Sequence, residues 1–70
     1  MVEKIKIDGE FITLGQLLKM VDLIDSGGQA KFFLKENEVL VNGELDDRRG
    51  RKLFPNDEIT IFNKQYRITL

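Results

Sequence analysis

The spacing of apolar residues changes along the chain and predicts the order of its elements. Residues 4–7 alternate polar and apolar side chains, which is the period of a half-buried strand, and residues 8–10 are typical of a turn. From residue 14 to residue 34 the apolar positions recur every three or four residues, as on one face of a helix. A two-residue period returns at residue 39. The pattern predicts a short strand, then helices, then a sheet.

The first helix has a recognisable start. Thr13 and Gln16 have the spacing of a capping box, in which the two side chains bind backbone N–H groups at the helix start. Leucines at the following positions, together with Val21, then occupy one helical face. We therefore expect a helix over residues 14–23.

The second helix repeats the same signal. Ser26 and Gln29 have the capping-box spacing, and Asn37 suits a left-handed residue at the helix end. We expect this helix over residues 27–36. Three residues form its apolar stripe, namely Ala30, Phe33 and Leu34.

The remainder of the chain is typical of strands joined by turns. Asn42 and Gly43 tolerate the positive φ of a tight turn, and residues 55–57 have the Pro-Asn-Asp composition of another. The order of elements predicts the α+β class, with two N-terminal helices packed on a small, mostly antiparallel sheet. Its later strands are expected at residues 39–41, 58–62 and 66–70, the last two joined across residues 63–65.

Composition restricts the chemistry available to this chain. Its 70 residues are enough for one domain, residues 1–70, with little room for an enclosed active site. Cysteine and histidine are both absent, which removes thiolate metal sites, the commonest metal ligand and the commonest general base. We therefore expect no metal, no cofactor and no enzymatic activity. No apolar run has the length of a signal peptide or a membrane span, so we expect a cytoplasmic protein without membrane contact.

Charge is strongly segregated along the sequence. Eleven basic residues nearly balance twelve acidic ones, yet four of the basic residues fall within residues 48–52, which we call the basic segment. Segregated positive charge favours an anion-binding surface, and RNA is the anion we expect. The alternative is a solvated loop whose cations pair with Glu44, Asp46 and Asp47. The cations of the basic segment are Arg48, Arg49, Arg51 and Lys52.

The second helix offers further candidates. Lys31 and Lys35 lie one turn apart beside the apolar stripe and can extend a basic surface. At the start of this helix, Ser26, Gly27 and Gly28 could let backbone N–H groups approach a phosphate. The two glycines are equally explained by close packing of the two helices.

Two other features have ordinary structural explanations. Phe32 falls opposite the apolar stripe and could stack an unpaired base, but we expect it to pack against the first helix or a strand. Asp46 and Asp47 are adjacent acids without converging ligands, which makes a poor metal site. We expect them to solvate a turn.

Several motifs together resemble a known RNA-binding family. The chain is similar to the domain first described in small-subunit ribosomal protein S-four, also called the alpha-L motif, over residues 11–62. The most specific part is a Val-Asn-Gly turn that follows a two-helix unit and precedes a basic loop. The segments that carry the resemblance are Ser26-Gly-Gly-Gln-Ala-Lys31, Glu38-Val-Leu-Val-Asn-Gly43, Arg48-Arg-Gly-Arg-Lys52 and Pro55-Asn-Asp-Glu-Ile59.

The resemblance implies a module that binds structured RNA through its second helix and its basic loop. Asn42 and Gly43 would shape the turn that presents this loop. The Gly-Gly-x-Ala-Lys and Arg-Arg-Gly-Arg-Lys motifs are similar to those of a bacterial subgroup in which the domain stands alone, and that subgroup suggests ribosomal RNA or an assembling ribosomal subunit as the partner. We expect a monomer. The implied RNA-binding residues are Lys31, Lys35, Arg48, Arg49, Arg51 and Lys52.

Two other functional classes remain possible from the sequence alone. The chain could be a protein-interaction module that uses its acidic surface and a terminal sheet edge at residues 66–70. An enzyme is the weaker hypothesis, because Tyr66, lysines and carboxylates are the only acid/base groups and no nucleophile is paired with a base.

Overall fold

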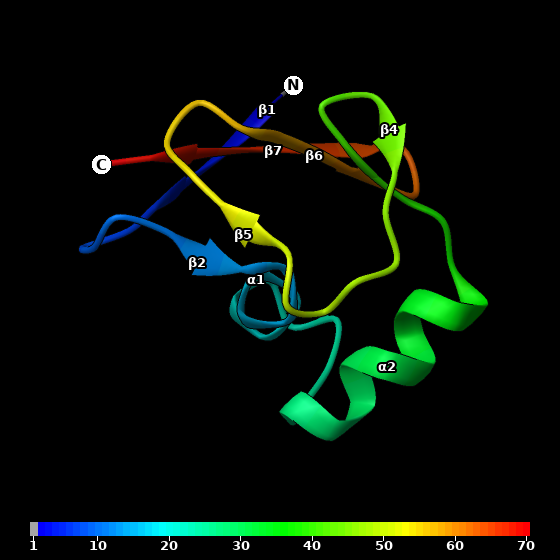
Figure 1. The fold of residues 1–70 in the computed structure, drawn as a ribbon. Coiled ribbons are helices and arrows are strands. Elements are labelled where there is room, and N and C mark those ends of the chain that lie inside the picture. Colours follow the sequence, from blue (N-terminus) through cyan, green and yellow to red (C-terminus); the bar gives the residue numbers. More distant parts are fainter. Residues whose placement is uncertain (1) are drawn as a thin grey trace.

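Two helices cover one face of a five-stranded sheet in the computed structural model, which describes residues 2–70 (Figure 1). The helices are α1 (Leu14–Met20) and α2 (Gly27–Glu36). The expected α+β class is confirmed. The strands are β1 (Val2–Lys6), β2 (Ile12–Thr13), β3 (Val39–Val41), β4 (Glu44–Leu45), β5 (Lys52–Leu53), β6 (Glu58–Ile61) and β7 (Lys64–Thr69).

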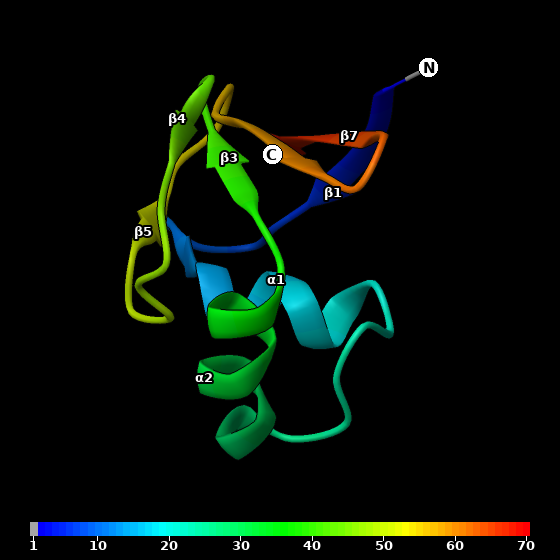
Figure 2. The ribbon, with the colours of Figure 1, turned by 90° about the vertical axis from the view of Figure 1, so that its right-hand side faces the viewer.

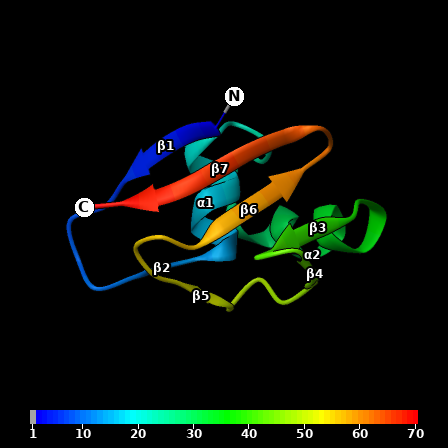
Figure 3. The same ribbon diagram turned by 90° about the horizontal axis from the view of Figure 1, so that it is seen from above.

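The main sheet has the order β1-β7-β6-β3-β4, which Figure 3 shows from above. All its pairs are antiparallel except β1 with β7, which run parallel with Ile5 opposite Ile68. Strand β7 therefore pairs on both sides, and the prediction of a sheet edge at residues 66–70 is wrong. Strand β1 occupies the side of β7 that was expected to be an open edge. The prediction failed because the alternation of residues 4–7 indicates a strand but not the strand with which it pairs.

A second, two-stranded sheet consists of β2 and β5. Neither strand was predicted, because each has only two residues and two residues show no period. Figure 2 shows the path of the chain into β5: β3 rises from the end of α2 into the sheet, and the connection from β4 to β5 returns beside the helices.

The core lies between the helices and the main sheet. Leu14, Leu17 and Leu18 of α1 are completely buried, and Ile59 and Ile68 meet them from the sheet side of the same cluster. Burying one such side chain contributes about 1.5–3 kcal/mol. The alternation of buried and exposed residues in β6 and β7 directs one face of these strands to the helices.

Helix α1 ends three residues earlier than its apolar pattern predicted. Asp22 has a φ of 61°, and the N–H of Leu23 donates to the carbonyl oxygen of Leu18 at 3.0 Å. The N–H of Asp22 donates to the carbonyl oxygen of Lys19 at 3.1 Å, and the two bonds together form a Schellman motif. The prediction failed because aspartate is less typical than glycine at this left-handed position.

Two further local predictions were wrong. Asn37 is extended, with φ −130° and ψ 142°, and its side-chain amide instead donates to the carbonyl oxygen of Phe33 at 3.1 Å. The hairpin between β6 and β7 turns at residues 62–63 rather than 63–65, because Ile61 pairs with Lys64. Phe62 has a φ of 57° there, a conformation that a bulky residue rarely adopts.

Candidate nucleic-acid interface

The basic segment forms the end of the connection from β4 and the first residue of β5, and its backbone is hydrogen-bonded to the start of α1. The N–H groups of Leu14 and Gly15 donate to the carbonyl oxygens of Arg51 and Arg49 at 2.8 and 2.9 Å. These N–H groups belong to the first turn of a helix, where no intrahelical acceptor exists. The free N–H groups of the helix and the carbonyl oxygens of the basic segment therefore satisfy one another. Because these bonds use only backbone atoms, the arginine side chains can contact other groups.

Gly15 makes this close approach possible. A Cβ atom at this position would lie 3.3 Å from the carbonyl oxygen of Arg49 and 3.6 Å from Cβ of Ala30. By contrast, a Cβ atom at Gly27 would meet nothing within 4 Å, and one at Gly28 would meet only Ser26 Oγ at 4.0 Å. Close helix packing therefore does not explain the two glycines of α2. A glycine inside the predicted first helix was the signal that sequence reasoning missed.

Asp46 holds two cations of the basic segment. Its Oδ2 atom accepts hydrogen bonds from Arg48 Nη2 and Arg51 Nη1, each at 2.8 Å. Its Oδ1 atom accepts from the backbone N–H of Arg48 at 2.9 Å and from Arg48 Nε at 3.1 Å. The Arg48 guanidinium, with Arg51 adding to it, holds the pKa of Asp46 well below its usual range. The same contact raises the pKa of Arg48.

The four cations of the basic segment therefore differ in their surroundings. Arg48 and Arg51 both form ion pairs with Asp46, as the hypothesis of a loop paired with upstream acids predicted. Arg49 and Lys52 have no carboxylate partner among residues 2–70. The paired guanidinium groups are fixed in position, and five N–H donors each leave some available for a ligand.

Three of these cations line one open hollow of about 600 Å³, which we call the basic hollow. It lies where the basic segment passes into the turn after β5. Cations that converge on one space suit a phosphate group. The lining residues are Arg48, Gly50, Arg51, Lys52, Phe54 and Asp57.

An aromatic pair adjoins the basic hollow. The ring centroids of Phe11 and Phe54 lie 5.7 Å apart, and Lys52 Nζ lies 4.9 Å from the centroid of the Phe11 ring. Phe11 precedes β2 and Phe54 follows β5, so the register of this strand pair places the rings opposite each other. Phe54 is 46% exposed. Sequence reasoning missed both rings because it did not detect β2 and β5.

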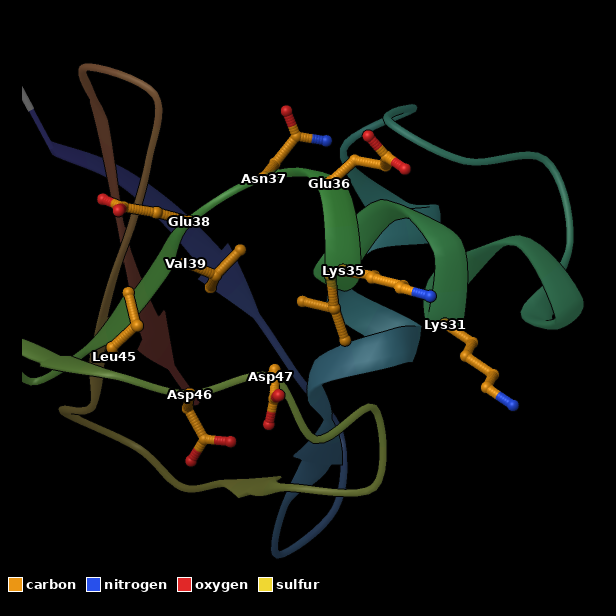
Figure 4. A pocket seen from close by; sticks show the side chains of 10 residues that line it. Lys31, Lys35, Glu36, Asn37, Glu38, Val39, Leu45, Asp46 and Asp47 are labelled. Atoms are coloured by element: carbon orange, nitrogen blue, oxygen red, sulfur yellow. The ribbon is translucent and has the colours of Figure 1, made fainter.

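The lysines of α2 lie in different surroundings. Lys31 and Lys35 line a separate hollow of about 800 Å³, between α2 and the connection that follows β4 (Figure 4). Asp46 and Asp47 come from that connection, and Figure 4 shows their carboxylates beside the same hollow. Glu36 and Glu38 line it as well. The structure therefore does not bring Lys31 and Lys35 into the basic hollow, and four carboxylates weaken their positive field.

Arg49 faces a third hollow, of about 370 Å³, at the start of α2. Gly27 lines this hollow together with Arg49, and so does Lys19, which sequence reasoning did not select. The cations thus gather at two neighbouring hollows that share Gly50.

Phe32 contradicts the expectation that its ring packs inside the protein. It is 69% exposed. It lines a hollow with Asp22, Asp25 and Glu36, and no cation lines that hollow. Its position on the polar side of α2 explains the exposure, because the helix buries Ala30 and Leu34 instead.

Comparison with known proteins identifies the family. A model of the S4 domain family matches residues 5–69. The chain belongs to the S4 domain family. This confirms the resemblance proposed from the sequence, and the match extends beyond residues 11–62 to include part of β1 and all of β7. A relative described as a probable ribosome maturation protein RlbA of Bacillus subtilis (strain 168) is 61% identical over 61 residues, which cover 87% of this chain and 86% of the relative.

Two kinds of feature are absent from residues 2–70. Within residues 2–70, no helix of this S4 domain is long and apolar enough to cross a membrane. Among the same residues, no three carboxylate side chains gather in a way that could hold a metal ion.

Proposed function

We propose that this S4 domain is a non-catalytic RNA-binding module that docks its basic segment on structured RNA, with ribosomal RNA or an assembling ribosomal subunit as the target. The single observation that carries the proposal is the convergence of Arg48, Arg51 and Lys52 on one hollow. Family membership and the relative named as a probable ribosome maturation protein support it. We expect the module to act in the cytoplasm as a monomer.

The proposed contacts are mainly to phosphates and 2′-hydroxyl groups. Arg48 and Arg51 are already positioned by Asp46, so binding a phosphate restricts them little further. Arg49 and Lys52 add charge that no carboxylate within residues 2–70 neutralises. Lys31 and Lys35 would contact the RNA backbone from α2.

The start of α2 is a further proposed point of approach. Gly27 has open space where a side chain would be, and it lines a hollow with Arg49 and Lys19. Backbone N–H groups at Gly27 and Gly28 can therefore be reached by a phosphate that Arg49 attracts. Asn42 and Gly43, with φ of 53° and 84°, would present the basic segment by turning β3 into β4.

A salt series tests the proposal. With roughly four to six phosphate contacts, the logarithm of the binding constant should fall against the logarithm of salt concentration with a slope of about −3 to −5. Purified protein would be titrated with ribosomal RNA and with ribosomal subunits. Arg49→Glu combined with Lys52→Glu should weaken binding and flatten the slope by about 2.

A matched double variant controls for net charge. Lys4→Glu with Lys6→Glu makes the same change in charge on β1, where both lysines are exposed and outside the basic hollow. This control should bind nearly as well as the native chain. Equal loss in both variants would reduce the effect to overall charge, and absence of RNA binding by the native chain would refute the proposed function.

A further inference from the structure

We propose that Phe54 stacks an unpaired base of the RNA whose adjacent phosphate occupies the basic hollow. The ligand is thus a single-stranded nucleotide in a loop or bulge, rather than a paired helix alone. This inference rests on the proposed function and adds a base-recognition site to it. It follows from the position of a half-exposed ring among cations, since Phe54 shares the hollow with Arg48, Arg51 and Lys52.

The ring of Phe54 is held in place before any ligand binds. Its backbone N–H donates to Asp57 Oδ2 at 2.8 Å, and its carbonyl oxygen accepts from the N–H of Asp57 at 3.0 Å. Asn56, within this turn, donates its N–H to the carbonyl oxygen of Ile68 in β7 at 2.8 Å. The ring also packs against that of Phe11, with an angle of 50° between the two ring planes. A preorganised ring loses little conformational freedom when a base stacks on it.

The charged residues around the basic hollow favour different positions for the phosphate and the base of a nucleotide. Arg48, Arg51 and Lys52 attract the phosphate, whereas Asp57 is the only carboxylate lining the hollow among the described residues and repels it. A carboxylate accepts hydrogen bonds from the exocyclic amino groups of adenine, cytosine or guanine. Asp57 therefore favours the base beside the ring, with the phosphate directed toward the cations.

The two most exposed rings, those of Phe32 and Phe62, lack this combination. Phe32 is more exposed than Phe54 but lies among Asp22, Asp25 and Glu36. Phe62 lines a hollow with two glutamates and no cation. Carboxylates around a ring repel the phosphate that accompanies every base, so exposure alone does not make a stacking site.

Tryptophan fluorescence gives a direct test, because the chain contains no tryptophan. Phe54→Trp introduces a single reporter at the proposed site, and Phe32→Trp introduces one at an exposed control position. The probes are an RNA hairpin with an unpaired adenosine loop and a blunt RNA duplex with the same number of phosphates. We expect the looped hairpin to quench the emission of Phe54→Trp, and neither RNA to quench that of Phe32→Trp.

Affinity provides the second readout. Stacking on one ring predicts that Phe54→Leu binds the looped hairpin about tenfold more weakly, with the duplex and the salt slope unchanged. Circular dichroism would verify that this variant is folded. If the native chain binds both RNAs and neither Phe54 variant shows the expected change, the stacking site is refuted while the proposed function stands. If the native chain binds neither RNA, both fail.

Discussion

The carbonyl oxygen of Arg49 accepts a 2.9 Å hydrogen bond from the N–H of Gly15, which joins the basic segment to the first turn of α1. The carbonyl oxygen of Arg51 makes the equivalent contact with Leu14 at 2.8 Å. Main-chain atoms therefore fix the path of the segment at Arg49 and Arg51. Arg49 and Lys52, whose side chains pair with no carboxylate among residues 2–70, can be exchanged with little effect on folding, which is why the charge variants proposed above are informative.

Gly15 should be intolerant of a larger residue. Gly15→Val places side-chain atoms against the carbonyl oxygen of Arg49, where even a Cβ atom would lie at 3.3 Å. We expect the free energy of unfolding to fall by about 1–3 kcal/mol, as in other overpacked sites. Urea denaturation would measure this change. Gly28→Val, at a glycine with open surroundings, should change stability by less than about 1 kcal/mol, and equal effects at both sites would contradict the packing argument.

Asp46 should stabilise the protein in a pH-dependent way. The folded state lowers the pKa of its carboxyl group through hydrogen bonds from Arg48 and Arg51. A group whose pKa is lower in the folded state contributes stability above its unfolded pKa, about 4, and that contribution disappears as the pH falls toward the folded pKa. Asp46→Asn should therefore lower the free energy of unfolding by about 1 kcal/mol at neutral pH.

The measurement for Asp46 is urea denaturation of both proteins at several pH values. The difference between native chain and Asp46→Asn should be constant above about pH 4 and should shrink below it. Asp47→Asn removes a neighbouring exposed carboxylate and is the control. A difference that grows on acidification would show that the sign of this linkage is wrong.

Asn42 should matter for two separable reasons. Its side chain accepts from the N–H of Glu58 at 2.9 Å and donates to Asp57 Oδ1 at 3.1 Å, and its φ is 53°. Asn42→Gly removes both side-chain hydrogen bonds but suits the left-handed backbone, and should lower the free energy of unfolding by about 1 kcal/mol. Asn42→Ala removes the same bonds and keeps a Cβ atom in the left-handed region without the local hydrogen bonding that lets asparagine adopt it, so it should cost about 1 kcal/mol more than glycine. Thermal or urea denaturation would rank the three proteins, and an alanine variant as stable as the glycine variant would exclude the backbone contribution.

The sequence predicted those elements whose signals are local and consistent. Helix α2 was predicted at its observed bounds because a cap signal and an apolar stripe agree. Strands β2 and β5 exist only through contacts between residues about 40 positions apart, with Ile12 opposite Leu53, and local periodicity cannot show such a pairing. The turn at Phe62 was misplaced because phenylalanine carries no turn signal.

In the candidate site, too, the features with a local sequence signal were predicted and those that depend on distant contacts were not. Charge density located the basic segment, since adjacent cations are visible in the sequence itself. Which cations pair with Asp46, and which line the hollow with Phe54, depends on how the chain folds back after β4. The ring beside the cations was therefore not identified, and Phe32, on the outer side of α2, was considered instead.

The parallel pairing of β1 with β7 also constrains the order in which this protein can be completed during synthesis. Among the strands described, β1 is translated first, yet in the main sheet it pairs only with β7, which is translated after all the others. Helices α1 and α2 and the basic segment can form while β1 is still unpaired. Closure of the sheet therefore cannot occur before β7 has been synthesised, and until then the growing chain carries an unpaired β1 strand with its backbone hydrogen-bonding groups exposed.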